Sequence, residues 1–229
     1  MSNIIYIPKP KPLFTPVKYG LLYNWYAATD SRNITNTGWR VPTNSDFVIL
    51  ANYVGDYMGS GDLYSNGYKF KDTDANWGVP SVPTNETKFN AMASGYRIFG
   101  SFSQMNTVFY IWSQEHSVVE AFRLEQSPQA YDYVIIQSNY TEDVRNHGMS
   151  LRLIKESTSL VDGESGTYTG NDGKIYRTIC IGTQEWIADN LCETKYRNGD
   201  LIPEVTNATT WSDLTTGALC AYNNDWNNV

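Results

Sequence analysis

Residues 171–206, NDGKIYRTICIGTQEWIADNLCETKYRNGDLIPEVT, carry the clearest structural pattern in this chain. Within them, residues 174–191 hold β-branched and aromatic side chains on both sides of Gly182. Such residues favour strands, and a glycine between two runs favours a turn. The pattern therefore predicts two strands that meet at Gly182. Further along, Trp211 and Leu214 are expected to anchor a polar stretch that ends in CAYNNDWNNV.

Upstream of this stretch, several more short strands are predicted. The runs are YRIFGSF, VFYIWSQE, EAFRLEQ, YDYVIIQS and MSLRLI, all between residues 96 and 154, and turn residues separate them. Residues 59–90 are rich in Gly, Asp, Asn, Thr and Pro, which is typical of a long surface loop. Short strands joined by long polar loops indicate an α+β fold and not a helical bundle.

Two short helices are expected near the start of the chain. Residues 19–28, YGLLYNWYAA, suit a helix with an aromatic face. The stronger signal lies in residues 43–55, where Thr43 suits the N-cap and an acidic residue follows in the first turn. The positions that carry this second prediction are Asp46, the helically spaced Phe47, Leu50 and Val54, and Gly55 at C′.

The chain divides into four parts by composition. Residues 1–17 form a proline-rich arm, residues 18–155 a first folded part, residues 156–166 a polar linker and residues 167–229 a second folded part. The arm is either a frayed terminus or a segment that docks on a partner. Docking would use its apolar residues, and the candidates are Ile5, Tyr6, Ile7, Leu13 and Phe14.

Charge and hydropathy exclude several classes of function. The net charge is −7, and the whole excess lies in residues 156–229, which contain four Lys/Arg and 11 Asp/Glu. An acidic chain without a basic stripe is a poor candidate for nucleic-acid binding. No apolar run is long enough for membrane insertion, and the N-terminal residues lack the pattern of a signal peptide.

The cysteines point to a reducing place of synthesis. Cys180, Cys192 and Cys220 are three in number and far apart, which does not suit a disulfide framework. One disulfide with one free thiol is the alternative. Their spacing does not match a zinc site, so no metal or other cofactor is expected.

Many separate motifs resemble the Fibrobacter succinogenes major paralogous domain family. Residues 171–206 resemble the family's DGN-Y-T-IG-Q-WMA-NL opening, and Trp211, Leu214 and the CAYNND run resemble its next element. The family's later elements are matched by YGLLYNWYA, GWRVPTNSDF, SGYRIFGSF, Trp112-Ser113 and SLRLIK, all within residues 19–155. The resemblance implies a C-type-lectin-like fold of the formylglycine-generating-enzyme type, with short helices, twisted antiparallel strands and long loops.

The order of these motifs departs from the family. In the family, the DGK…YNND half comes first, whereas here it occupies residues 167–229. Either the module is circularly permuted and closes on itself, or residues 167–229 complete a neighbouring subunit. A third interpretation is a truncated second module after a complete first one.

A binding function is expected rather than catalysis. The resemblance implies that reactive cysteines of oxidase relatives belong to the second half of the domain, yet residues 19–155 contain no Cys. The three cysteines are expected to be buried small hydrophobic residues. His116 and His147 lie in no nucleophile motif. The NNDWNN run is oxygen-rich, but Asx turns explain it without calcium.

Aromatic residues near the loops are the candidate ligand-binding residues. They are Trp77, Tyr110, Tyr131, Tyr133 and Tyr140. Tyr and Trp offer rigid contact area, but packing explains loop aromatics equally well. Trp25, Trp39, Trp112 and Trp186 coincide with family motifs and are expected in the core.

The leading functional hypothesis is a bacteriophage structural protein, made in the host cytoplasm and built into the virion. Its partners would be other virion proteins or identical subunits, with outward loops that contact a host-surface glycan or protein. The alternative is a secreted or cell-surface bacterial adhesin. An oxidase-like enzyme is the remaining alternative.

Overall fold

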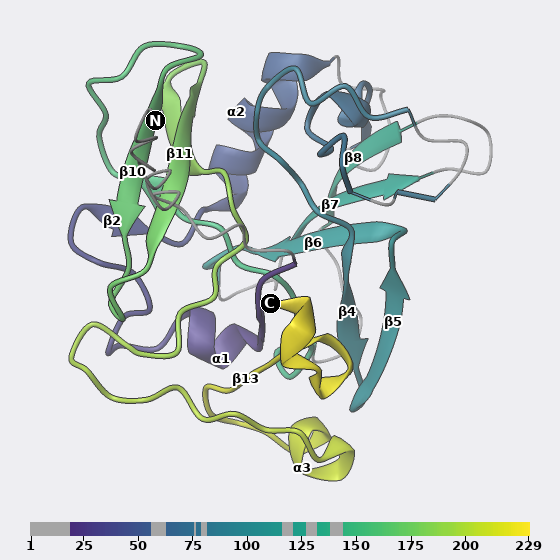
Figure 1. Ribbon diagram of the computed structural model, residues 1–229, viewed down its shortest axis with the longest axis vertical. Coiled ribbons are helices and arrows are strands. Elements are labelled where there is room, and N and C mark those ends of the chain that lie inside the picture. Colours follow the sequence, from purple (N-terminus) through teal and green to yellow (C-terminus); the bar gives the residue numbers. More distant parts are fainter. Residues whose placement is uncertain are drawn as a thin grey trace, which may run out of the picture.

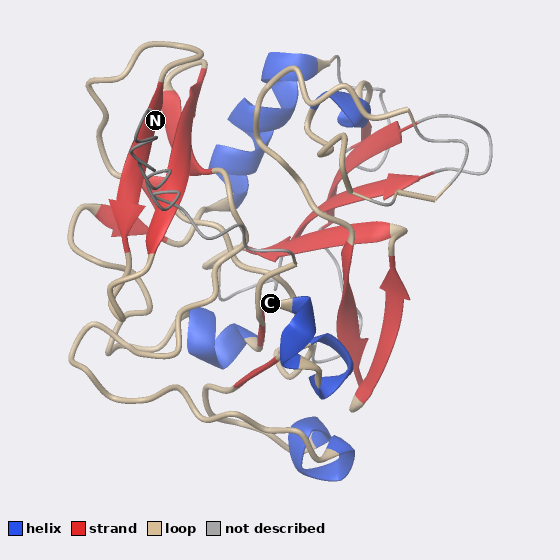
Figure 2. Ribbon diagram, in the orientation of Figure 1, coloured by secondary structure: helices blue, strands red, loops and turns tan. Residues whose placement is uncertain are grey.

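The described residues build four antiparallel sheets and three α-helices. The structure is a computed structural model that describes residues 19–55, 63–75, 77–78, 82–115, 121–126, 132–137 and 144–229. The sheets and the short helices between them appear in Figures 1 and 2. This is an α+β fold dominated by short strands, as the sequence predicts. None of the helices described is both long and apolar enough to cross a membrane.

A five-stranded sheet joins distant parts of the chain. Its order is β10 (Ser165–Thr169), β11 (Ile175–Ile181), β12 (Gln184–Ile187), β9 (Ile154–Lys155) and β2 (Trp39–Arg40). The predicted pair of strands around Gly182 is confirmed, and Gly182 has a φ of 60° in the turn. Because β12 pairs with β9 through Trp186 and Ile154, residues from both folded parts share one sheet.

The other sheets are smaller. A four-stranded sheet has the order β3 (Leu63–Tyr64), β8 (Asp132–Gln137), β7 (Ala121–Gln126) and β6 (Val108–Trp112). β4 (Ser94–Ile98) and β5 (Ser101–Met105) form a hairpin, and β1 (Leu22–Tyr23) pairs with β13 (Leu219–Cys220). In Figure 1 the hairpin projects on the opposite side of the molecule from β10 and β11.

The α-helices are α1 (Trp25–Ala28), α2 (Asn44–Val54) and α3 (Ala208–Ser212), and short 3-10 turns occur elsewhere in the described residues. These turns span Gly67–Lys69, Tyr222–Asn224 and Trp226–Asn228. The predicted aromatic helix over 19–28 is wrong in its first half, because Leu22–Tyr23 pairs with β13. The Asn24 side chain then accepts the Ala27 amide and starts the short α1.

Two predicted strands have different bounds. Residues 96–102 were expected as one strand, but Phe99 and Gly100 have φ values of 46° and 77° and make the turn of the β4–β5 hairpin. In the run 149–154 only Ile154 belongs to a strand, while Met149 and Ser150 form isolated bridges. β10 also begins at Ser165, before the expected boundary at residue 167.

Helix α2 follows its predicted cap. Thr43 is the N-cap, and its hydroxyl accepts the Asp46 amide while the Asp46 carboxylate accepts the Thr43 amide. Gly55 was expected at C′ and is the C-cap of α2, one position earlier, with extended backbone and a φ of −160°. A side chain there is excluded by contact, because a Cβ on Gly55 would lie 2.3 Å from the Ser65 carbonyl oxygen.

The capping box gives a first prediction. We expect Thr43→Ala to lower the free energy of unfolding by about 1 kcal/mol, because the Asp46 amide loses its side-chain acceptor. Thr43→Ser keeps a hydroxyl at the same place and should restore most of the loss. Urea denaturation followed by circular dichroism measures both, and equal losses in the two variants would contradict the capping role.

The core draws on both folded parts of the chain. One hydrophobic cluster includes Phe47 and Phe109 together with Ile179 and Trp186, and another includes Trp25 and Trp112 together with Tyr176. The predicted core placement of Trp25, Trp39, Trp112 and Trp186 is confirmed, since none is more than 7% exposed. Trp211 is also buried, whereas Leu214 is only partly buried beside it.

Two buried arginines bind backbone carbonyls of distant segments. Arg97 donates to the carbonyls of Val205 and Thr206 at 2.7 and 2.9 Å. Arg152 donates to the Asn190 side chain at 3.0 Å and to carbonyls on both folded parts. Burial lowers the pKa of Arg152 to about 9, which still leaves its guanidinium charged at neutral pH. The hydrogen bonds of these two arginines therefore connect residues 165–229 with residues 19–155.

The two ends of the described chain meet. The Tyr19 amide donates to the Asn228 carbonyl at 3.1 Å, and the Asn190 side chain donates to the Tyr19 carbonyl at 2.7 Å. Asn24 likewise binds Thr216 and Ala218. Figure 1 shows the C-terminus close to the purple start of the described chain. Residues 165–229 therefore complete the fold of their own chain in this structure.

Candidate functional site

A polar groove of about 520 Å³ lies beside β2 and is the candidate site. Residues 28–41 form one side, residues 114–115 and 156 another, and Arg197 closes the groove from the second folded part. Four of its lining residues are apolar and buried, namely Ala28, Ile34, Trp39 and Val41. The surface that the groove presents is therefore mainly polar.

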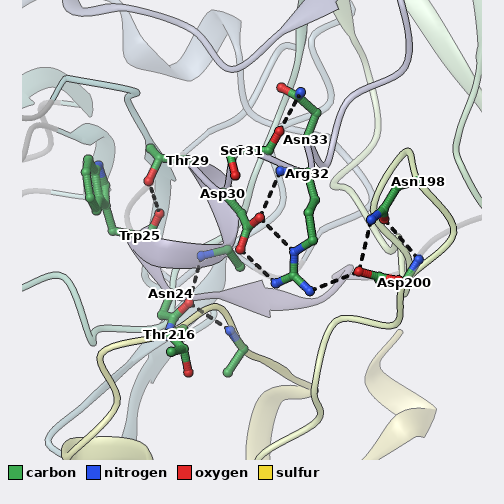
Figure 3. Close-up of polar contacts among 12 residues, drawn as sticks. Asn24, Trp25, Thr29, Asp30, Ser31, Arg32, Asn33, Asn198, Asp200 and Thr216 are labelled. Carbon is green, nitrogen blue, oxygen red and sulfur yellow. Dashed lines mark hydrogen bonds and ion pairs between the residues drawn. The ribbon is translucent and has the colours of Figure 1, made fainter.

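One carboxylate of the groove, Asp30, is already paired with a neighbouring arginine (Figure 3). Asp30 accepts three hydrogen bonds from Arg32, from its amide and its guanidinium, and Arg32 also reaches Asp200 at 3.3 Å. The Arg32 guanidinium lies 4.1 Å from the centre of the Tyr196 ring. This network holds the loop after α1 against the 198–200 turn and lowers the pKa of Asp30.

The charges beside α2 are paired in the same way. Arg40 binds both carboxylate oxygens of Asp46, at 2.5 and 2.8 Å, and this pairing lowers the pKa of Asp46. Glu115 accepts the Asn44 amide at 2.8 Å, at the first residue of α2. Arg40 and one oxygen of Glu115 are thus occupied in positioning the backbone around the groove, while the other Glu115 oxygen is buried and accepts no hydrogen bond from the described residues.

Three polar side chains at the edge of the groove are not held in ion pairs with the described residues. Gln114, Glu156 and Arg197 are exposed. Arg197 uses Nε and Nη2 on Thr35, at 2.8 and 3.3 Å, while its Nη1 has no hydrogen bond within the described residues. The side chains of Gln114 and Glu156 likewise make no hydrogen bond or ion pair to the part of the chain that the structure describes. The rim therefore offers an amide, a carboxylate and a guanidinium N–H to a ligand.

A second polar cluster is buried and structural. Glu193 is fully buried and accepts the Tyr176 hydroxyl at 2.7 Å and the Asp172 amide at 2.9 Å. Burial raises the pKa of the Glu193 carboxyl to about 7, and the nearby Asp172 adds to the rise. The Asp172 carboxylate pairs with Lys174, which lowers its own pKa. The two acids thus differ in protonation near neutral pH.

Glu193 makes stability depend on pH. Its folded pKa, about 7, lies above the ordinary 4.5, so the unfolded chain ionises first as pH rises. The contribution of Glu193 to the free energy of unfolding is fully present below pH 4.5, decreases as the pH rises to about 7, and is lost above that pH. We expect Glu193→Gln to flatten this fall, which amounts to about 3 kcal/mol at most. Asp172 acts in the opposite sense, below pH 4.

Urea denaturation at pH 4.5, 6 and 8 measures the effect. The relevant quantity is the change of the unfolding free energy with pH. A hydrogen bond lost on mutation would lower the free energies at all three pH values together and leave that change the same. Parallel pH profiles for the wild type and Glu193→Gln would contradict the raised pKa.

The structure describes only some of the predicted site residues. Trp77 and Tyr110 are 6% and 8% exposed, so both pack inside the fold rather than on its surface. Trp77 lies 4.3 Å from Lys71 Nζ, and Tyr110 accepts a hydrogen bond from Arg123 at 3.1 Å. Tyr131, Tyr140, the Tyr133 side chain and the arm residues Ile5, Tyr6, Ile7, Leu13 and Phe14 lie outside the described residues.

The cysteines are buried, as the sequence predicts. All three are free thiols, so the alternative with one disulfide is wrong. Burial raises the pKa of Cys180, raises that of Cys192 to about 11 and that of Cys220 to about 12. Such thiols stay protonated at neutral pH and are poor nucleophiles. His147 is buried as well, while His116 lies outside the described residues.

The NNDWNN run forms turns. Asp225 accepts the Asn227 amide at 2.9 Å, and Asn223 and Asn224 both have φ of 56°. This confirms the Asx-turn interpretation of the run. Within the ranges described, no group of three or more His, Cys, Asp or Glu side chains is placed to hold a metal ion.

The comparison with protein families decides the relationship of the chain. The model of the Fibrobacter succinogenes major domain matches residues 12–155, which is more than half of the chain. The chain belongs to this family. No curated protein and no solved structure matches it.

The matched range of the Fibrobacter succinogenes major domain ends beside the polar linker. It contains both carbonyl-binding arginines, Arg97 and Arg152, and also Asn24. All three bind residues beyond the matched range, in the segment 187–218. These three side chains of the family domain therefore find hydrogen-bond acceptors in residues 165–229.

Sequence reasoning missed the groove. Its rim residues Gln114, Glu156 and Arg197 are isolated polar residues in three separate segments, and no spacing links them. The GWRVPT motif did contain Trp39 and Arg40, which lie at the groove, but the motif pointed only to the core.

Proposed function

We propose that this protein is a non-enzymatic binding and assembly module, and that the polar groove beside β2 is its binding site. The observation that carries the proposal is the pairing of the charged groups around the groove. Asp30 and Arg40 are held in ion pairs, and Glu115 accepts the backbone amide of Asn44. Catalytic acids and bases, by contrast, need a pKa matched to proton transfer and access to the substrate.

The thiols support a function without catalysis. An oxidase of the formylglycine-generating type would act through reactive cysteines, and those of this chain are buried with raised pKa values. The buried Glu193, whose pKa is near 7, also lies away from solvent and is not part of the groove.

Binding to bacterial surfaces tests the proposal. Purified protein is mixed with cells and isolated envelopes from a panel of bacteria, and the bound fraction is measured by co-sedimentation. Gln114→Trp places a bulky ring at the groove rim and is expected to abolish binding. Thr183→Trp places the same ring at an exposed turn elsewhere and is expected to leave binding intact. Failure of the wild-type protein to bind any surface would contradict the proposal.

We further propose that the module acts in a bacteriophage particle, with a secreted or cell-surface adhesin as the alternative. The proline-rich sequence of residues 1–17, with its apolar side chains, supports attachment to a larger assembly. Mass spectrometry of purified particles separates the two cases. Presence of the chain in particles supports the virion role, and its presence only on bacterial surfaces supports the adhesin.

We also infer that the module is a circularly permuted C-type-lectin-like fold. The family match ends at residue 155, while residues 165–229 supply β10 to β13 of the same sheets. The contact between Tyr19 and Asn228 joins the two ends where the family order would run on.

A reordered chain tests the permutation. It would run from residue 165 to 229, through a short glycine-rich linker, and on from residue 19 to 156. If the module is permuted, this chain should fold with a circular dichroism spectrum like that of the natural order. A reordered chain that stays unfolded would contradict the inference.

A further inference from the structure

A second pocket, of about 340 Å³, is lined by the turn at residues 85–90 and by the paired strands β10 and β11 (Figure 1). It shares no lining residue with the groove beside β2. We propose that this pocket binds a small carboxylate with an apolar body, and that Lys88, Arg177 and Ser165 hold the carboxylate. This inference goes beyond the proposed function, because it assigns a second site and the class of ligand for it.

The free polar groups of this pocket all donate hydrogen bonds. The Lys88 ammonium group and the Ser165 hydroxyl make no hydrogen bond or ion pair within the described residues. Arg177 uses Nε and Nη2 on Asp189, while its Nη1 binds nothing in the same part of the chain. An ammonium group and a guanidinium group can only donate, and a hydroxyl can donate as well. The ligand must therefore supply acceptors, and a carboxylate offers two oxygens for three donors.

The charges around the pocket leave one positive charge for a ligand. No carboxylate is among the described residues that line it. Arg177 is paired with Asp189, and it also interacts with Asp72 and with the buried Arg152. Together with Lys88 these are three cations and two carboxylates, so one positive charge is left over. A single negative charge on the ligand is therefore favoured, and a second one would meet no partner.

Three further carboxylates lie near the lining residues along the chain or in the sheet. Glu86 pairs with Lys69 at 3.7 Å, and Glu185 pairs with Lys155 at 2.9 Å. Glu164 accepts a backbone amide of the preceding turn at 2.9 Å and is exposed, so that solvent screens its charge. None of the three forms an ion pair with a cation of the pocket.

The turn that carries Lys88 is held in a conformation that lysine rarely adopts. Lys88 has a φ of 57°, which is uncommon for residues other than glycine and asparagine. The Asn85 side chain closes the turn, because it donates to Asn90 Oδ1 at 2.6 Å and accepts the Asn90 amide at 3.0 Å. Asn90 also donates to the Ala188 carbonyl at 3.3 Å, which joins the turn to the end of β12. Such backbone conformations cluster at functional sites, and here the backbone of Lys88 is fixed before a ligand arrives.

The apolar body of the ligand follows from the surface of the pocket. Unlike the groove beside β2, this pocket presents a mainly apolar surface. A carboxylate of one or two carbon atoms would leave most of that surface in contact with water. An alkyl chain of several carbon atoms would cover it, so affinity should rise with the length of the chain. The volume of about 340 Å³ is within the range of sites for small ligands.

Four ligands that share an unbranched six-carbon body test the inference with the complete protein. They are hexanoate, hexyl phosphate, hexylamine and hexanol, and acetate tests the need for the apolar body. Isothermal titration calorimetry at pH 7 and low salt measures their binding. We expect hexanoate to bind with a dissociation constant of about 1 mM or lower, and more tightly than each of the other four.

The variant Lys88→Met tests the assignment of the pocket. It removes the charge but keeps a side chain of similar length, and it should weaken hexanoate binding roughly tenfold or more. Lys88→Arg keeps the charge and should restore most of the affinity. The matched control Lys195→Met removes an exposed lysine outside both pockets and should bind hexanoate like the wild type. Thermal unfolding of each variant controls for loss of the fold.

Other results overturn the inference in distinguishable ways. Equal binding of hexanol and hexanoate would contradict the need for a negative charge, and tighter binding of hexyl phosphate would contradict the preference for a single one. Hexanoate binding that Lys88→Met retains would place the carboxylate elsewhere, and absence of hexanoate binding would remove the site altogether. The groove variant Gln114→Trp should keep hexanoate binding, so that this inference and the proposed function fail separately.

Discussion

Replacing Arg152 with methionine is expected to lower the free energy of unfolding by about 3–5 kcal/mol. The methionine keeps an apolar stem between Phe89 and Phe109, whose ring centres lie 4.4 and 5.2 Å from the guanidinium. It removes the donors to the carbonyls of Phe89, Asn90 and Ile187, however. Buried acceptors that lose their donors keep the full cost of leaving water.

The control is Lys69→Met. Lys69 pairs with Glu86 at 3.7 Å, and the Glu86 side chain is 55% exposed. A surface ion pair contributes about 1 kcal/mol at most. Urea denaturation of both variants at one pH measures the difference. Equal, small losses would show that the carbonyl contacts of Arg152 do not hold the two parts of the chain together.

The second large effect is expected at Trp186. This residue lies in the segment beyond the family match, yet it is fully buried against Phe47 and Phe89, at ring-centre distances of 6.0 and 5.9 Å. Trp186→Ala leaves a large cavity between residues of both parts. We therefore expect a loss of about 3–5 kcal/mol in the free energy of unfolding.

Trp226→Ala is the control for this substitution. Trp226 belongs to the same segment but is 46% exposed, and its indole N–H binds only Glu204. Its removal should cost less than about 1 kcal/mol. If Trp186→Ala were equally mild, residues 165–229 would pack only loosely on the rest of the chain, and the shared core would be contradicted.

The features that local sequence patterns predict are those that local interactions determine. Helix α2 begins at its expected N-cap because Thr43 and Asp46 satisfy each other's amides within four residues. β11 and β12 meet at Gly182 for a similar reason. The aromatic run 19–28 was only partly helical, because pairing of Leu22–Tyr23 with β13, about two hundred residues away, outweighs helix formation.

The motifs also identified the family, but not the physical role of their residues. Arg97 and Arg152 stood out in the sequence only as parts of longer matches, and their partners are carbonyls that no pattern marks. The groove was missed for the same reason, since three separate loops supply its rim. Trp77 and Tyr110 were candidates from composition, and their burial became visible only with the fold.

The central claim is that residues 165–229 complete the fold of their own chain. The most direct test inserts a protease site between Ser157 and Ser159, both exposed in the linker, and cleaves the folded protein. Light scattering after size-exclusion chromatography then gives the mass. We predict that both fragments elute together at a mass close to 25.9 kDa, one copy of each, and separate only in denaturant. Fragments that separate in native buffer, or that elute at twice that mass or more, would contradict the claim.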